Sequence, residues 1–89
     1  MKIIVCNIGS SSFKFQLIDM TSETMIARGY TERVGADSSP IAYYIKDKLV
    51  FSTTEYIPTH RESVQHALNF LIDPQFELLS NLDEISGIG

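Results

Sequence analysis

The chain has 89 residues, of which 44% are hydrophobic and 20% are charged, and its net charge is −4. This ordinary globular composition argues against a disordered chain, and the acidic balance without a Lys/Arg cluster argues against a nucleic-acid partner. No apolar stretch approaches the roughly 20 residues of a membrane span, and the single cysteine can form no disulfide within the chain, so we expect a cytoplasmic protein with no membrane partner.

The first 30 residues predict three strands joined by two short turns. Residues 3–6 are a continuous apolar run with β-branched side chains, which is typical of a strand that is buried on both faces. Along residues 13–18, Phe13, Phe15 and Leu17 fall on one face and Lys14, Gln16 and Ile18 on the other, and residues 24–30 have strand propensity. Because short connections permit antiparallel pairing but no parallel crossover, we expect an antiparallel meander.

A polar loop and a second pair of strands follow the meander. The loop covers residues 32–40, which include Gly35 and Pro40. Residues 41–45 and 49–56 have high strand propensity, and the polar residues between them suit a turn. We therefore expect a β-hairpin in this part of the chain.

One main helix is predicted after the hairpin. Thr59 and Glu62 have the spacing of a capping box, with Thr59 as the N-cap. The apolar residues that follow at helical spacing are Val64, Ala67, Leu68 and Leu71. Residues 73–74, Asp-Pro, end the helix, because proline disfavours helical geometry in the preceding residue. Residues 76–82 suit a short second helix, and residues 85–89 a further strand or turn. We expect the fold class to be α/β, with an α+β mixed sheet.

The pattern N-x-G-S-S-S-x-K at residues 7–14 is the densest candidate for a functional site. Gly9 permits a tight turn, and the hydroxyls of Ser10 and Ser12, together with backbone N–H groups, can donate to phosphate oxygens. Asn7 offers an oxygen suited to Mg²⁺ or its bound water, and Lys14 offers a positive charge. The spacing differs from that of a Walker loop, and a hairpin turn built of ordinary turn residues is the alternative interpretation.

Other candidates are weaker. Cys6 is expected to be a small buried hydrophobic residue rather than a catalytic thiol. His60 and His66 are six positions apart and so do not share the i, i+4 helix face of a metal pair, which makes solvated surface histidines the better interpretation. The Glu32–Arg33 pair follows a strand, and a solvated surface pair is a sufficient interpretation of it. Residues 83–84 are expected at the surface.

Residues 5–19, VCNIGSSSFKFQLID, resemble the opening of the acetate kinase family, which includes related short-chain acyl kinases. The resemblance continues in order to the end of the chain, through residues 32–35, 58–60, 67–68, 73–74 and 82–85. It implies part of a ribonuclease H-like domain of the superfamily of sugar kinases, Hsp70 and actin. Residues 1–89 would be the N-terminal part of the first of two domains.

The resemblance also implies a reaction, in which ATP and acetate give ADP and acetyl phosphate reversibly with Mg²⁺. Asn7 matches the magnesium-associated asparagine of the family, Ser10 and Ser12 match its phosphate-loop serines, and Lys14 matches a contact to the nucleotide phosphates. No catalytic residue of the family matches a position within this chain. A propionate or butyrate kinase, and a non-catalytic module that binds a partner, are the alternatives.

The resemblance further implies a homodimer for the full-length enzyme and a coding sequence that continues past Gly89 with a His-Arg pair. The substrate-binding arginines and the adenosine pocket of the family would follow there. We therefore expect the 89-residue chain to be inactive alone.

Overall fold

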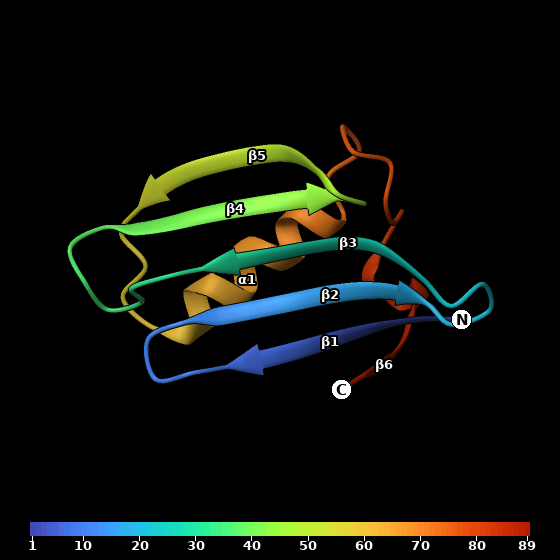
Figure 1. Ribbon diagram of the computed structural model, residues 1–89, viewed down its shortest axis with the longest axis horizontal. Coiled ribbons are helices and arrows are strands. Elements are labelled where there is room, and N and C mark those ends of the chain that lie inside the picture. The colour runs from blue at the N-terminus through green and yellow to red at the C-terminus, as the bar shows by residue number, and fades with distance from the viewer.

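Six strands form one mixed sheet, and one α-helix packs across one of its faces, in a computed structural model that describes residues 1–89 (Figure 1). The elements in chain order are β1 (Lys2–Ile8), β2 (Phe13–Asp19), β3 (Thr24–Thr31), β4 (Ser39–Ile45), β5 (Lys48–Glu55), α1 (His60–Leu71), the 3₁₀-helix η1 (Leu82–Glu84) and β6 (Ile85–Ile88). The mixed α/β class predicted from the sequence is confirmed. No helix in the structure is long and apolar enough to cross a membrane.

The strand order is β5-β4-β3-β2-β1-β6. Strands β1 to β5 pair antiparallel with their neighbours in the chain, so the predicted meander is confirmed and the predicted hairpin extends it, because β4 pairs with β3 as well as with β5. The last strand, β6, pairs with β1 in parallel. Residues 85–88 therefore form a strand that joins the edge of the sheet beside β1.

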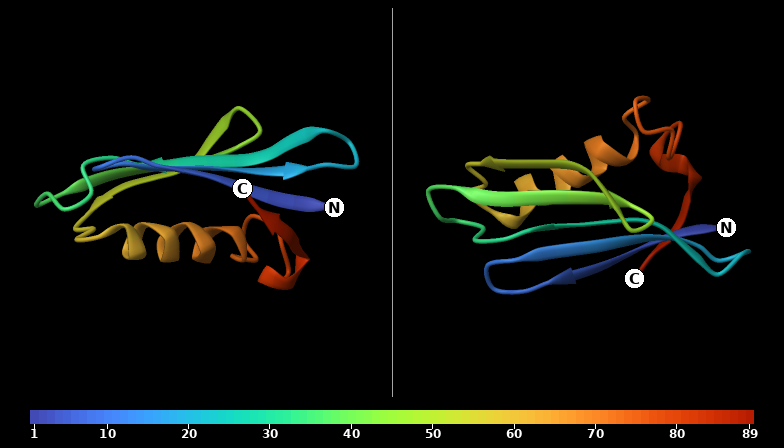
Figure 2. Two further views of the ribbon diagram at one scale, coloured as in Figure 1. Left: turned by 90° about the horizontal axis from the view of Figure 1, so that it is seen from below. Right: turned by 45° about the horizontal axis from the view of Figure 1, so that its top comes forward.

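The left view of Figure 2 shows α1 lying along one face of the sheet, and the core lies between these two layers. The apolar side chains that alternate along β2 point toward the helix and are buried, as the alternation predicts, and they pack with Ala67 and Leu71 of α1. Gly29 on β3 permits this packing, because a Cβ atom there would lie 2.3 Å from Cδ1 of Tyr43. The core fixes which side chains of β1 to β3 face away from α1.

The prediction that residues 3–6 are buried on both faces is wrong. Ile4, which points toward α1, is buried, but Ile3 and Val5 on the opposite face are only half-buried. The chain has a single α-helix, and it covers only one face of the sheet. The apolar outer side of β1 is therefore left partly open.

The predicted helix and its N-cap are confirmed, and the backbone N–H of Thr59 donates to the Glu62 carboxylate at 3.0 Å. The buried face of the helix is turned slightly from the predicted one. Ser63 and Phe70 are buried with Ala67 and Leu71, whereas Val64 and Leu68 are only half-buried.

The predicted helix over residues 76–82 is wrong. This stretch forms turns, with Glu77 in the left-handed region at a φ of 54°, and only residues 82–84 form a helical turn of the 3₁₀ type. The backbone N–H groups of Ser80 and Asn81 donate hydrogen bonds to the Glu84 carboxylate. These two groups are therefore hydrogen-bonded although the segment is not helical.

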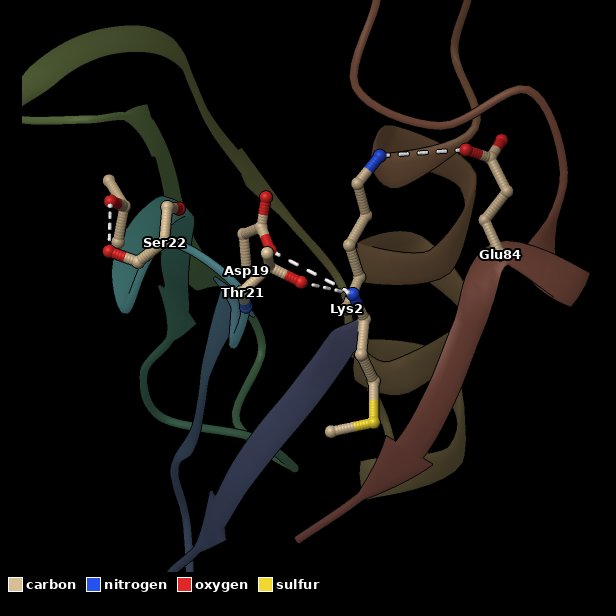
Figure 3. Close-up of polar contacts among 7 residues, drawn as sticks. Lys2, Asp19, Thr21, Ser22 and Glu84 are labelled. Atoms are coloured by element: carbon tan, nitrogen blue, oxygen red, sulfur yellow. Dashed lines mark hydrogen bonds and ion pairs between the residues drawn. The ribbon is translucent and has the colours of Figure 1, made fainter.

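The N-terminus is held at one end of the sheet (Figure 3). The Met1 ammonium donates to the Thr21 hydroxyl at 3.0 Å and lies 3.9 Å from the Asp19 carboxylate. Lys2 forms an ion pair with Glu84 at 3.5 Å, which joins β1 to the segment before β6. These contacts lie at the opposite end of β1 from Asn7, so they leave the end that contains the serine pattern free.

Candidate phosphate-binding site

Asn7 and Lys14 are direct cross-strand partners on β1 and β2. Ile4 on β1 and Phe13 and Phe15 on β2 are buried against α1, so the alternation of side chains places Asn7 and Lys14 together on the opposite face. Both side chains are exposed, and neither forms a hydrogen bond or ion pair within the protein. The two residues that the sequence indicates for metal and phosphate are therefore neighbours with free polar groups.

Residues 9–12, the serine turn, connect these two strands. The Gly9 N–H donates to the Ser12 carbonyl at 2.9 Å, which closes the turn. A Cβ atom on Gly9 would lie 2.7 Å from the Ser12 hydroxyl oxygen, so a larger residue at this position would displace the Ser12 hydroxyl. The hydroxyls and backbone N–H groups of Ser10 and Ser12 have no partner within the protein, and they are free to donate to an oxyanion.

A second loop lies against the serine turn. The loop between β3 and β4, residues 32–38, contacts the turn through the Val34 N–H, which donates to the Ser11 carbonyl at 2.8 Å. Figure 1 shows this loop, the serine turn and the start of α1 at the same end of the sheet. The Glu32–Arg33 pair thus belongs to a loop that borders the candidate site, and no ion pair forms between its two members. Sequence reasoning missed this contact because it joins backbone groups that are distant along the chain.

A groove of about 370 Å³ continues from Asn7 and Lys14 across the helix-free face. Its polar lining adds Gln16 of β2 and Arg28 and Tyr30 of β3. The Arg28 guanidinium stacks on the Tyr44 ring at 4.0 Å, and neither Arg28 nor Lys14 forms an ion pair. The groove therefore has two cationic side chains without an acidic partner, an arrangement that favours an anionic ligand.

Comparison with known protein families identifies the family of this chain. The acetokinase family model matches residues 2–89. The chain belongs to the acetokinase family. The acetate kinase of Clostridium novyi (strain NT) is 40% identical over 89 residues, and that of Methanosarcina thermophila is 38% identical. Each alignment covers 100% of this chain and 22% of the relative, so the chain spans about a fifth of the length of the curated relatives it matches.

Solved structures agree with this assignment. The Porphyromonas gingivalis acetate kinase superimposes with a TM-score of 0.89 at 27% identity, over 99% of this chain and 22% of that one. A propionate kinase from Francisella tularensis subsp. tularensis SCHU S4 gives a TM-score of 0.75 at 22% identity, over 99% of this chain and 21% of that one, which supports the fold alone. The predicted resemblance to the acetate kinase family is confirmed.

The acetokinase family consists of kinases, and kinases generally use a divalent cation with the nucleotide. The chain has no cluster of three acidic, histidine or cysteine side chains that could hold such an ion by itself. The Asn7 amide and the serine hydroxyls are exposed neutral oxygens, which fit a Mg²⁺ ion that keeps most of its waters and binds mainly to substrate phosphates. In this acetokinase chain, Asn7 would be the residue that touches the ion or its water.

The prediction that His60 and His66 are solvated surface histidines is wrong. His66 is half-buried, and its Nδ1 lies 2.6 Å from the Tyr43 hydroxyl while its Nε2 lies 3.1 Å from the Glu55 carboxylate. Burial, with a smaller effect of the Glu55 charge, raises the pKa of Tyr43. The imidazole tautomer of His66 sets which of the Tyr43 hydroxyl and Nδ1 donates in their hydrogen bond. His66 therefore links α1 to β4 and β5 on the face opposite the groove. His60 is also half-buried, and its Nδ1 is enclosed without a partner.

Cys6 on β1 has the environment expected of a structural residue. It is half-buried against the core, and burial raises the pKa of its thiol, which disfavours the reactive thiolate. Glu84 pairs with Lys2 at the far end of β1 from the serine turn. Neither residue contributes to the candidate site of this acetokinase chain.

Proposed function

We propose that residues 1–89 are the N-terminal part of the first domain of an acetate kinase, a cytoplasmic homodimer in its full-length form. The reaction is the reversible transfer of the γ-phosphoryl group of ATP to acetate. The observation that supports this most directly is the pairing of Asn7 with Lys14 beside the unpartnered serine turn, in a chain of the acetokinase family. Membership of the family supports a kinase, and the site supports binding of phosphate.

In the transfer, a carboxylate oxygen of acetate attacks the γ-phosphorus, and the bond from that phosphorus to the bridging oxygen of ADP breaks. No proton is required, because the nucleophile is already an anion and ADP leaves as one. Catalysis therefore consists mainly of positioning and neutralisation of charge. Mg²⁺, when bound, neutralises phosphate charge and orients the phosphates.

The residues of this chain supply one side of the phosphate site. Lys14 offers a point charge to the phosphates, and the free N–H and O–H groups of the serine turn donate to phosphate oxygens. Asn7 orients the ion or its bound water. The proposed transfer requires neither a proton acceptor nor a nucleophile from the protein, so we assign these groups to binding and assign no catalytic residue to this chain.

The test is to assay the full-length protein that contains this chain for ADP formation with acetate, propionate or butyrate. We expect acyl phosphate to form and to be trapped by hydroxylamine, with acetate giving the highest kcat/KM. ADP formation at the same rate without any carboxylate would contradict the proposed acceptor, and absence of turnover with all three would contradict the proposed activity. Preference for propionate or butyrate would change the substrate and keep the reaction.

A further inference from the structure

We propose that Ser39 is a positioning residue for the serine turn, and that its buried hydroxyl acts through the loop between β3 and β4. The inference rests on the proposed function only in assigning the serine turn to phosphate binding. Two hydrogen bonds form a relay. The first joins Ser39 to Arg33, and the second joins the next residue, Val34, to Ser11.

The first link holds an uncommon backbone conformation. Ser39, at the start of β4, is fully buried, and its hydroxyl donates to the Arg33 carbonyl at 2.9 Å. Arg33 has a φ of 51°, in the left-handed region that residues other than glycine rarely adopt. The same carbonyl accepts the Ala36 N–H at 3.1 Å. A strained residue persists where its surroundings hold it, and here two donors converge on its carbonyl.

The second link transmits that conformation to the serine turn. The left-handed Arg33 directs the N–H of the next residue, Val34, at the Ser11 carbonyl, which accepts it at 2.8 Å. The Ser11 carbonyl and the Ser12 N–H belong to one planar peptide unit. Fixing the direction of the carbonyl therefore fixes the direction of the Ser12 N–H, which has no partner in the protein.

This arrangement gives Ser39 a role that simple burial would not. The Ser12 N–H is available to a phosphate oxygen only if it is held toward the ligand in advance, because a mobile donor must be ordered when the ligand binds. Loss of the Ser39 bond should loosen the loop, free the Ser11–Ser12 peptide to rotate and weaken nucleotide binding. The chemistry of transfer needs no group on Ser39, so kcat should change less than KM.

Ser63 provides a matched control for the loss of a buried hydroxyl. It is equally buried, and its hydroxyl also donates to a backbone carbonyl, that of His60 at 2.7 Å, but it lies on α1 and makes no contact in the relay. In the full-length protein, we expect Ser39→Ala to raise the KM for ATP about fivefold, the effect of losing one neutral hydrogen bond. Ser63→Ala should leave that KM within about twofold of the wild-type value.

Two substitutions at the exposed Arg33 test the same link if Ser39→Ala does not fold. Valine disfavours the left-handed conformation strongly, whereas glycine adopts it without strain, and both remove the guanidinium. We expect Arg33→Val to raise the KM for ATP more than Arg33→Gly. Combining Arg33→Gly with Ser39→Ala should restore part of the affinity that Ser39→Ala loses.

Amide hydrogen exchange provides a readout that does not depend on activity. In the full-length protein without ligand, Ser39→Ala should speed exchange in the peptide that contains Val34, and Ser63→Ala should not. Equal exchange in the two variants, or equal KM values for Arg33→Val and Arg33→Gly, would overturn the role of Ser39. If the wild type transfers no phosphoryl group while exchange responds as expected, the proposed function fails and the relay stands.

Discussion

Asn7 and Lys14 are seven positions apart in the sequence and adjacent in space because a four-residue turn pairs their strands. Each has an exposed side chain without a partner in the protein, so neither contributes a contact whose loss would unfold the chain. Substitutions at these positions should therefore separate function from stability.

We expect Asn7→Ala to lower the kcat of the full-length protein tenfold or more, which corresponds to about 1.4 kcal/mol in the barrier. The loss should depend on magnesium concentration, because Asn7 is assigned to the ion or its water. The measurement is turnover across a magnesium titration, with thermal unfolding of both proteins as the control for stability. Turnover equal to that of the wild type at every magnesium concentration would refute the assignment.

Lys14→Ala should act mainly on nucleotide binding and raise the KM for ATP, since a point charge beside the phosphates is lost. Lys48→Ala is the matched control, because Lys48 is also exposed on a strand but begins β5, away from the groove. Steady-state kinetics of the two variants decide the matter. Identical KM values would assign Lys14 to the solvated surface.

The sequence was sufficient to predict the serine turn and the antiparallel pairing of the two strands that it connects, because alternation and a short connection determine both. It was not sufficient for the contact between Val34 and Ser11, which involves only backbone atoms and leaves no trace in side-chain chemistry. His66 was also misjudged. Its spacing along the helix excludes a metal pair, but only the packing of α1 on β4 and β5 shows that it lies against Tyr43 and Glu55.

At the scale of elements, Gly29 on β3 is the cross-strand partner of Tyr43 on β4, and an added Cβ there would meet two aromatic rings. A Cβ atom at Gly29 would lie 2.3 Å from the Tyr43 ring and 2.7 Å from that of Phe15. We expect Gly29→Ala to destabilise the chain by about 1 to 3 kcal/mol, as over-packing of a core commonly does. Urea unfolding measures this.

Gly87→Ala is the control for Gly29→Ala. At Gly87 on β6, the nearest atom to an added Cβ would be Cγ2 of Ile3 at 3.5 Å, which is an ordinary contact. The control should change the free energy of unfolding by less than about 1 kcal/mol. Equal effects of the two substitutions would mean that strand propensity of glycine, and not the close approach of the aromatic rings, determines the result.

The start of α1 depends on pH through Glu62. Its hydrogen bond with the Thr59 side chain, and then its backbone bonds, hold the pKa of this carboxyl below its usual value. A lowered pKa in the folded state means that the capping contribution is fully present above the unfolded value, near 4.5, and is lost as the pH decreases through the folded value. Near neutral pH the contribution is fully present, so stability there should not change with pH through this group.

We expect Glu62→Gln to reduce the loss of stability between pH 5 and pH 3, a range that begins above the ordinary pKa near 4.5 and extends below it. The free energy of unfolding is measured at several pH values, with Glu23→Gln in the exposed turn after β2 as the control. If the free energy of unfolding has the same pH dependence in the two variants, protonation of Glu62 removes no stabilisation by the capping box.

The sequence was a good guide where an element is determined by its own residues, as the capping box at Thr59 shows. It was a poor guide for residues 76–82, whose apolar spacing suits a helix. There, side-chain bonds from Glu84 and packing of Leu79 into the core hold the chain in turns instead. These are tertiary influences, and they override a weak local preference.

At the scale of the whole molecule, this chain spans about a fifth of the length of its relatives, and in the proposed function its residues supply only one side of the phosphate site. Phosphoryl transfer requires donor, acceptor and ion to be held in line, usually in a site closed to water. We expect the purified 89-residue chain to show no acetate kinase turnover, even at high concentration.

A coupled assay tests this, with a blank and the full-length protein measured beside the chain. Turnover that follows the 89-residue chain through purification and disappears in Asn7→Ala would mean that these residues hold a complete active site. Activity that persists in Asn7→Ala would instead indicate a contaminating enzyme.

The parallel pairing of β6 with β1 has a consequence for how the molecule folds. Lys2 pairs with Ile85, whereas each of the other strand pairs joins neighbours in the chain. Closing a long loop costs more entropy than closing a hairpin, so the meander should form before β6 adds to its edge. During synthesis, the strands of the meander also leave the ribosome first. Strand β1, which contains Asn7, would thus complete its pairing with β2 while its other edge is still unpaired.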